Sequence, residues 1–140
     1  MTNDEFIAWL KKEEGVVKHA YQDHLGYWTI GVGRLIDKRK GGGLSDEEID
    51  YLLGNDIEKK LAEVRKALPW FDNLTSNRKA VLVAMAFQMG IKGLLGFKNT
   101  LKMIETGDYE KAAKGMLNSK WAKSDSPARA KRTAELMKNG

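Results

Sequence analysis

The segment from residue 45 to residue 68 constrains the fold of this chain more than any other. Apolar residues recur in it with helical spacing, and Pro69 ends the pattern because proline cannot continue a helix. Ser45 and Glu48 have the spacing of a capping box, which marks the start of a helix. At 1.5 Å per residue, such a helix is about 35 Å long. A helix of this length joins two lobes, or it is one long helix of a bundle.

The residues before this segment predict a helix followed by a small sheet. A capping-box pair at the start predicts a helix over residues 3–14, which Gly15 ends. Aromatic and β-branched residues are concentrated in residues 18–36, where Leu25-Gly26 offers a turn. We therefore expect a small antiparallel sheet in this stretch.

The residues after the long segment predict a group of packed helices. Residues 81–89 are apolar on nearly all sides, which is typical of a helix buried at the centre of a bundle. Ser126 followed by Pro127 predicts a helix that is capped by the serine and begins at the proline. We expect further helices near residues 97–105, 108–119 and 127–138.

The composition describes a globular protein with a basic surface. Hydrophobic residues make up 42% and charged residues 31% of the 140 residues, as in ordinary globular domains. The absence of cysteine excludes disulfides, cysteine zinc sites and a thiol nucleophile. The net charge of +5 favours nucleic acid, anionic lipid or acidic envelope polymers as partners, or simply keeps the surface solvated.

Two carboxylates and a hydroxyl follow each other near the N-terminus. Glu14 stands directly before Gly15, at the negative end of the expected helix, where the helix dipole raises the pKa of a carboxyl group. Asp23 follows beside the expected turn, and Thr29 follows on the expected strand. Two carboxylates in different electrostatic environments are what hydrolysis of a glycosidic bond needs. Each residue also has an ordinary structural interpretation: a solvated acid at a helix end, a turn-capping aspartate and a strand-forming threonine.

The motif that contains these residues resembles that of the phage-type lysozymes, glycoside hydrolase family 24. Glu14, Asp23 and Thr29 keep the family's spacing within the pattern Glu-Gly…Ala-Tyr-Gln-Asp…Gly-Tyr-Trp-Thr-Ile-Gly-Val-Gly. Residues 86–101 resemble the family's central buried helix and the turn after it, and residues 119–132 resemble its C-terminal arginine-rich helix. The resemblance covers nearly the whole chain, in the same order.

This resemblance implies an α+β fold that is mostly helical, with a single lysozyme domain over residues 1–140. A small β lobe over residues 16–44 is then joined by a linking helix over residues 45–68 to a helical lobe. The helical lobe comprises residues 69–140 together with the N-terminal helix 3–14.

The resemblance also implies the reaction, which is hydrolysis of the β-1,4 bond between N-acetylmuramic acid and N-acetylglucosamine in peptidoglycan. Glu14 matches the family's general acid, and Asp23 and Thr29 match the residues that position the attacking water in an inverting mechanism. Inversion requires the two carboxyl groups to lie roughly 6.5–9.5 Å apart, which leaves room for that water.

The family's supporting residues match four further positions of this chain. The substrate contacts fall on Leu35, Phe87 and Thr100, and Phe87 is equally consistent with a core residue. An arginine that lies near the catalytic glutamate in the family falls on Arg129. An arginine beside Glu14 lowers the pKa of its carboxyl group and so opposes the effect of the helix end.

The chain departs from the family pattern at three places outside the catalytic positions. Arg34 stands where relatives have a histidine that pairs with an aspartate of the long helix, so we predict an ion pair between Arg34 and Asp56. The loop over residues 37–44 is short and basic, so we expect it to be mobile and the cleft to be more open. Gly115 takes the place of a substrate-binding asparagine, which removes one sugar contact.

The implied role is lysis of a host bacterium by a phage or prophage endolysin whose partner is peptidoglycan. The N-terminal sequence shows no signal-peptide pattern, so we expect the protein to stay in the host cytoplasm until a separate holin-type pore releases it to the cell wall. We expect a monomer that does not insert stably into membranes, binds no nucleic acid and uses neither a cofactor nor a metal ion.

Three other functions remain open from the sequence. A lytic transglycosylase cleaves the same bond but needs no carboxylate to direct water, so Asp23 and Thr29 argue against it. A non-catalytic wall-binding protein with this fold is opposed by the intact catalytic positions. A nucleic-acid binder is supported only by the basic composition, because no DNA- or RNA-reading motif is present.

Overall fold

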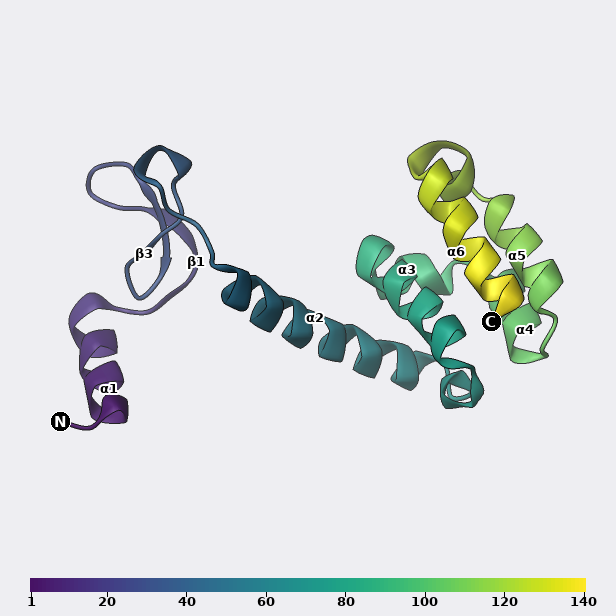
Figure 1. The fold of residues 1–140 in the computed structure, drawn as a ribbon, viewed down its shortest axis with the longest axis horizontal. Coiled ribbons are helices and arrows are strands. Elements are labelled where there is room, and N and C mark those ends of the chain that lie inside the picture. The colour runs from purple at the N-terminus through teal and green to yellow at the C-terminus, as the bar shows by residue number, and fades with distance from the viewer. The chain divides into compact units, whose positions relative to one another are not determined.

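The structure is a computed structural model that describes residues 1–140, and it divides into two compact units (Figure 1). Met1–Leu52 contains the first helix and a three-stranded sheet, and Leu53–Gly140 is helical. The mostly helical α+β fold predicted from the sequence is confirmed. The elements in chain order are α1 (Asn3–Glu14), β1 (Val17–Gln22), β2 (Trp28–Gly31), β3 (Arg34–Leu35), η1 (Lys38–Lys40), α2 (Asp46–Ala67), η2 (Phe71–Asn73), α3 (Ser76–Leu95), α4 (Lys98–Glu105), α5 (Tyr109–Leu117), η3 (Trp121–Asp125) and α6 (Pro127–Asn139).

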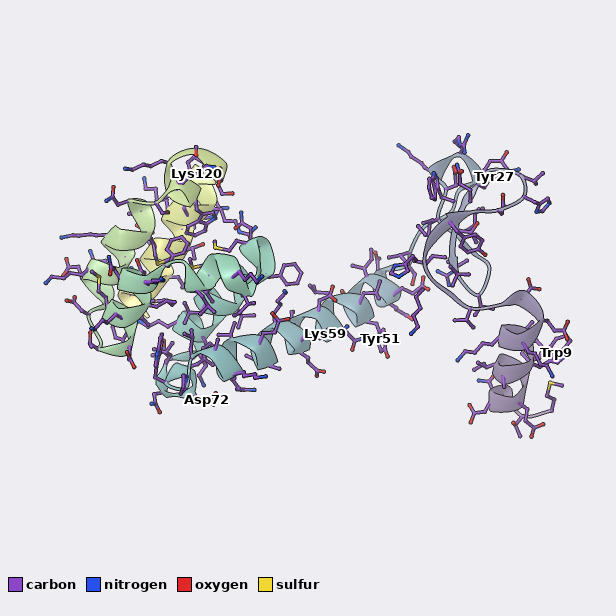
Figure 2. The ribbon with its side chains drawn as sticks, turned by 180° about the vertical axis from the view of Figure 1, so that it is seen from behind. Trp9, Tyr27, Tyr51, Lys59, Asp72 and Lys120 are labelled. Atoms are coloured by element: carbon purple, nitrogen blue, oxygen red, sulfur yellow. The ribbon has the colours of Figure 1, made fainter.

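Helix α1 begins and ends where the sequence predicts. The Thr2 hydroxyl accepts a hydrogen bond from the backbone N–H of Glu5 at 3.1 Å. Gly15 ends the helix with a φ of 79°, a conformation that favours glycine. No residue of α1 is buried, and the side chain of Trp9 points away from the helix axis (Figure 2) with 47% of its surface exposed. The helix is therefore defined by its caps rather than by packing within Met1–Leu52.

The predicted antiparallel sheet is present, with the strand order β1-β2-β3. Thr29 of the central strand pairs with Tyr21 of β1 and with Leu35 of β3. The register of β1 on β2 shifts between Val17 and Tyr21. Thr29, which is 5% exposed, therefore lies in the middle of the sheet.

A buried carboxylate organises the turn after β3, which the sequence predicts to be a mobile loop. Asp37 is 6% exposed, and its carboxylate accepts hydrogen bonds from the guanidinium and the backbone N–H of Arg39. The backbone N–H of Trp28 donates to Asp37 Oδ2 at 3.4 Å. These contacts, the Arg39 side chain first among them, hold the pKa of Asp37 well below its usual range. The expected mobile loop is therefore a folded 3₁₀ turn, η1, that is tied to strand β2.

Gly42 packs against the backbone beneath this turn. Its N–H donates to the carbonyl of Asp37 at 3.0 Å. A Cβ on Gly42 would lie 2.5 Å from the carbonyl oxygen of Leu35 and 2.9 Å from the backbone nitrogen of Ile36. Only glycine fits there, because backbone atoms cannot move aside as the end of a flexible side chain can.

Helix α2 starts with the predicted capping box. The Ser45 hydroxyl accepts from the N–H of Glu48 at 3.2 Å, and Glu48 Oε1 accepts from the N–H of Ser45 at 2.8 Å. The helix has 22 residues, which confirms the long helix expected over residues 45–68. The boundary between the two compact units falls within it, after Leu52.

The second unit is built around a continuous apolar core. Helices α4, α5 and α6 lie where the sequence predicts helices, and Gly90, with a φ of 79°, kinks α3. No single helix is long and apolar enough to cross a bilayer; α3 and α4 reach that length and composition only as a pair bent by 104°. The largest fully buried side chains are Val64, Phe71, Val81, Leu82, Leu94, Ile104, Met116 and Met137.

The packing at Gly42 predicts a specific sensitivity to alanine. Gly42→Ala lowers the free energy of unfolding by about 2 kcal/mol, because the added methyl group is forced against backbone atoms. Gly54 of α2 is the matched control, since a Cβ there meets nothing within 4 Å. Gly54→Ala raises the free energy of unfolding by roughly 0.5–1 kcal/mol, because alanine favours the helix. Urea unfolding followed by circular dichroism measures both, and equal stability of the two variants would contradict the packing described at Gly42.

Candidate active site

Glu14, the last residue of α1, extends to the turn between β2 and β3. Its Oε2 lies 4.0 Å from the position that a Cβ on Gly33 would occupy. Gly33 has a φ of 67° and Gly15 a φ of 79°, so the chain bends through glycine conformations both directly after Glu14 and in this turn. The carboxyl group is exposed. The fold thus brings an accessible acid to one end of the small sheet.

Asp23 is fixed by the turn that follows β1. Its Oδ1 accepts hydrogen bonds from the backbone N–H groups of Leu25 and Tyr27, each at 2.9 Å. The backbone closes the same turn, because the N–H of Asp23 donates to the carbonyl of Tyr27 at 2.9 Å. This is the side-chain-capped turn that the sequence offered as the structural interpretation of Asp23. Both side-chain bonds fall on Oδ1, which leaves Oδ2 available to a further donor such as water.

Thr29 is connected to Asp23 through the backbone of one residue. The Thr29 hydroxyl donates to the carbonyl of Tyr27 at 3.0 Å, and the N–H of Tyr27 donates to Asp23 Oδ1. Because its proton is used in this bond, the hydroxyl oxygen of Thr29 is left to accept a hydrogen bond. Leu35, a predicted substrate contact, is the cross-strand partner of Thr29 and is half-buried. The carboxylate, the hydroxyl and the leucine are thus positioned by one turn and one sheet.

Arg34 has a different partner from the one that the sequence predicts. Its guanidinium donates to Glu48 Oε1 at 2.8 Å, and its Nη1 lies 2.6 Å from Glu48 Oε2. The predicted partner, Asp56, is eight positions further along α2. Glu48 reaches Arg34 because the capping box folds its carboxylate back over Ser45, at the start of the helix. Within Met1–Leu52 the ion pair of Arg34 is therefore the one with Glu48, while a contact with Asp56, which belongs to the second unit, stays a prediction.

This contact changes the titration of both groups. The hydrogen bond from Arg34, followed by that from the backbone of Ser45, lowers the pKa of Glu48 from 4.5 to about 2. The same contact raises the pKa of Arg34. Glu48 was missed as a site residue, although its capping-box spacing with Ser45 was a visible signal that its carboxylate turns back toward the sheet.

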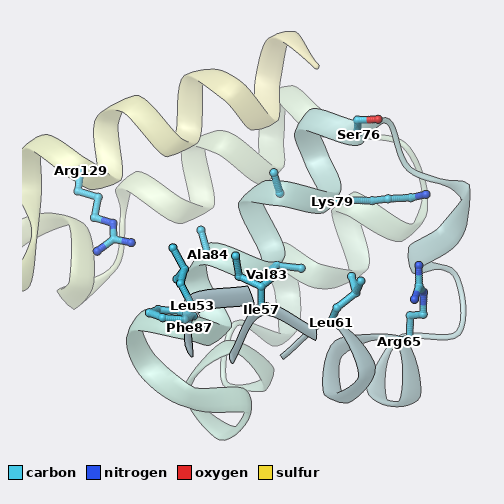
Figure 3. A pocket seen from close by; sticks show the side chains of 11 residues that line it. Leu53, Ile57, Leu61, Arg65, Ser76, Lys79, Val83, Ala84, Phe87 and Arg129 are labelled. Atoms are coloured by element: carbon cyan, nitrogen blue, oxygen red, sulfur yellow. The ribbon is translucent and has the colours of Figure 1, made fainter. Parts of the chain in front are cut away.

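Phe87 and Arg129 line an apolar groove of about 560 Å³ within the second unit (Figure 3). Apolar side chains of α2 and α3, among them Ile57 and Val83, form its floor. Phe87 is 45% exposed, so in this unit it is a surface residue rather than part of the buried core. The placement of Arg129 near Glu14 stays a prediction.

Thr100 lies at a separate hollow of about 530 Å³ that α4 and α5 form. The residue is 6% exposed, and it is one of those that line the hollow. The missing side chain of Gly115 leaves this space open, since a Cβ there would lie 2.7 Å from Thr100 Oγ1.

A hydrogen-bond network that the sequence did not reveal joins α3 to the start of α6. Gln88 Oε1 accepts from the indole N–H of Trp121 at 3.1 Å, and Gln88 Nε2 donates to the Ser126 hydroxyl at 2.7 Å. Ser126 was expected to cap α6, but its side chain forms no capping bond and instead accepts the hydrogen bond from Gln88. Gln88 follows Phe87 directly, so the network fixes the part of α3 that carries the groove residue.

Comparison with known proteins gives one family and several relatives. The Phage lysozyme family matches residues 11–138, a range that contains all the site residues described above. "Probable T4-type lysozyme 1" of Dictyostelium discoideum is 30% identical, with 94% of this chain and 92% of that protein aligned. "Endolysin" of Acyrthosiphon pisum secondary endosymbiont phage 1 is 26% identical over 86% of this chain and 80% of its own length. "Pre-baseplate central spike protein Gp5" of Enterobacteria phage T4 is 28% identical over 99% of this chain, which spans 28% of that protein.

The Arg34–Glu48 pair predicts a defined loss of stability in acid. Since the pKa of Glu48 is lowered from 4.5 to about 2, its contribution is complete above pH 4.5 and disappears as the pH falls toward 2. Glu48→Gln is therefore less stable than the unmodified chain at pH 6, and the difference narrows between pH 5 and pH 2. Glu47→Gln, one position earlier in α2, is the matched control. Thermal unfolding across this pH range measures the effect, and a constant gap for Glu48→Gln would contradict the ion pair.

Proposed function

Because the chain belongs to the phage lysozyme family and is a glycoside hydrolase, we propose that it cleaves peptidoglycan at one defined bond. That bond is the β-1,4 linkage between N-acetylmuramic acid and N-acetylglucosamine, and it is hydrolysed with inversion. The observation that carries the proposal is the Asp23–Tyr27–Thr29 arrangement, in which a carboxylate binds the backbone N–H of Tyr27 and a hydroxyl binds its carbonyl. Such a pair is suited to hold one water molecule in a fixed orientation.

In this reaction Asp23 acts as the general base. Its Oδ1 is occupied by two backbone N–H groups, so the carboxylate cannot rotate freely. Oδ2 accepts a proton of the water, while the hydroxyl oxygen of Thr29 accepts the second hydrogen bond from the same water. The water oxygen then attacks the anomeric carbon from the face opposite to the leaving group, as inversion requires.

Glu14 acts as the general acid. Its proton passes to the glycosidic oxygen as the bond to the anomeric carbon breaks, so the leaving sugar departs as a neutral alcohol. The position of Glu14 at the exposed C-terminal end of α1 supports this role, because the carboxyl group is accessible to a substrate there. Gly33 beside Oε2 supports it as well, since a residue without a side chain leaves space for a sugar next to the acid.

Substrate binding is assigned to Leu35, Phe87 and Thr100. Leu35 is supported by its place beside Thr29 in the sheet, and Phe87 by its exposed ring. Thr100 is supported by its place in the lining of the hollow beside Gly115, where its hydroxyl is the polar group nearest to the missing side chain. These contacts are of the kind that carbohydrate sites use, with apolar surface for the ring faces and a few polar groups for the hydroxyls.

The biological role in this proposal is lysis of a host bacterium. The endolysin among the relatives supports it, as does the match to a phage enzyme family. The protein is held in the host cytoplasm until a separate holin-type pore gives it access to the wall, and it acts as a monomer. A lytic transglycosylase is the second candidate, and it differs in leaving an anhydro ring in place of a reducing end.

Mass spectrometry of the products tests the reaction and the acid together. Purified peptidoglycan digested by the unmodified chain should release muropeptides with reducing N-acetylmuramic acid ends. Glu14→Gln should lower the release at least about a thousandfold, because the leaving group then departs without a proton. Glu13→Gln, which changes the neighbouring acid of α1, should retain full activity. Anhydro-muramic ends would assign the protein to the transglycosylases, and equal losses in both variants would remove Glu14 from its role.

A further inference from the structure

The small sheet carries a second hollow, on the face opposite to Thr29. Successive side chains of a strand point to opposite faces, and Trp28 is 46% exposed where Thr29 is 5% exposed. Trp28 lines a shallow hollow of about 660 Å³ with Ala20 and Ile36. The indole of Trp28 is therefore an exposed apolar surface beside Ala20 and Ile36. The catalytic proposal gives this surface no role.

The turn that borders this hollow is positively charged, and its residues Asp37, Lys38 and Arg39 line the hollow. Residues 37–43 contain three cationic side chains and one carboxylate. That carboxylate, Asp37, is buried and neutralised by Arg39 at 2.7 Å, so Lys38 and Lys40 remain as uncompensated cations of the turn. Lys38 lines the hollow directly. The local charge is therefore positive beside an exposed aromatic ring.

Two cations of the turn, Arg39 and Lys40, are also held in place. The guanidinium carbon of Arg39 lies 5.2 Å from the centre of the Tyr27 ring, and Lys40 Nζ lies 4.9 Å from the same centre. Tyr27 stands in the turn region of the small unit (Figure 2). Cation–π contacts and the Asp37 hydrogen bonds thus order this turn before any ligand binds. Ligand binding then costs less conformational entropy than it would with a flexible turn.

We propose that this hollow binds an acidic polysaccharide, at a site separate from the one that cuts peptidoglycan. The flat indole of Trp28 suits the apolar face of a sugar ring, and Lys38 and Lys40 suit the carboxylate or other anionic groups that such a polymer carries at every repeat. We favour a polymer over a small anion because the hollow is open and shallow. A single repeat unit would therefore bind weakly, whereas successive repeats of one chain add their contacts to the binding free energy. The site holds the protein on an acidic envelope polymer whether or not Glu14 acts.

The test measures binding without cleavage. The full chain carrying Glu14→Gln is titrated with polygalacturonate and, separately, with neutral dextran in a calorimeter at low ionic strength. Polygalacturonate should bind and dextran should not, and added salt should weaken the binding because it screens exposed charges. In the same background, Lys38→Ala/Lys40→Ala should weaken binding by about tenfold, since two exposed charge contacts are lost. Trp28→Leu should also weaken it, and Trp28→Phe, which keeps an aromatic ring, should retain most of it.

The matched control is Lys59→Ala/Lys66→Ala, which removes the same charge from exposed positions of α2. It should change binding less than twofold. Equal losses in the two double variants would overturn the proposal, because net charge alone would then explain the binding. Equal binding of dextran, no binding of polygalacturonate, or binding only to phosphatidylglycerol vesicles would overturn it as well. If the chain does not bind the acidic polysaccharide at this hollow, the products of peptidoglycan digestion are unaffected. This outcome is therefore distinguishable from failure of the proposed hydrolysis.

Discussion

The buried carboxylate of Asp37 is the contact on which the small unit depends. Met1–Leu52 contains no buried apolar side chain, and its two buried residues, Thr29 and Asp37, are both polar. Asp37 accepts hydrogen bonds from Arg39 and from the backbone of Trp28, while the carbonyl of Trp28 accepts from the N–H groups of Ile36 and Asp37. A buried charge is costly unless it is paired and hydrogen-bonded. Here the pairing is complete, and it joins the central strand to the turn that follows the sheet.

This way of building the unit has consequences for the chemistry. Hydrogen bonds are directional, so a strand and a turn fixed by them place polar groups with defined orientations. Asp23 and Thr29 are both positioned through the peptide groups of Tyr27, one residue before the strand that Asp37 anchors. The second unit uses a different source of stability, an apolar core that extends from Val64 to Met137. That core holds the helices that carry Phe87, which is exposed, and Thr100, which is buried.

The sequence predicted the parts of the structure that local rules determine. Capping boxes and helical periodicity gave α1 and α2 nearly to the residue, and alternating β-formers gave the sheet, because both signals arise within a few residues of the chain. Contacts that depend on side-chain placement in space were missed. Arg34 pairs with Glu48, Ser126 binds Gln88 instead of capping α6, and the glycine-rich turn is ordered by Asp37. In each case the side chain's partner depends on the folded backbone, which neither composition nor spacing specifies.

The three catalytic positions were proposed from spacing and resemblance, and the structure adds a physical reason for two of them in the Asp23–Tyr27–Thr29 arrangement. The central claim is that this arrangement directs a water molecule at the anomeric carbon. The configuration of the newly formed reducing end tests it most directly, by proton nuclear magnetic resonance of a chitin or peptidoglycan oligosaccharide in the first minutes of cleavage. Inversion of the β bond predicts that the α anomer appears first and the β anomer follows by mutarotation. If the β anomer appears first, the reaction proceeds with retention, and Asp23 and Thr29 do not direct the attacking water as described.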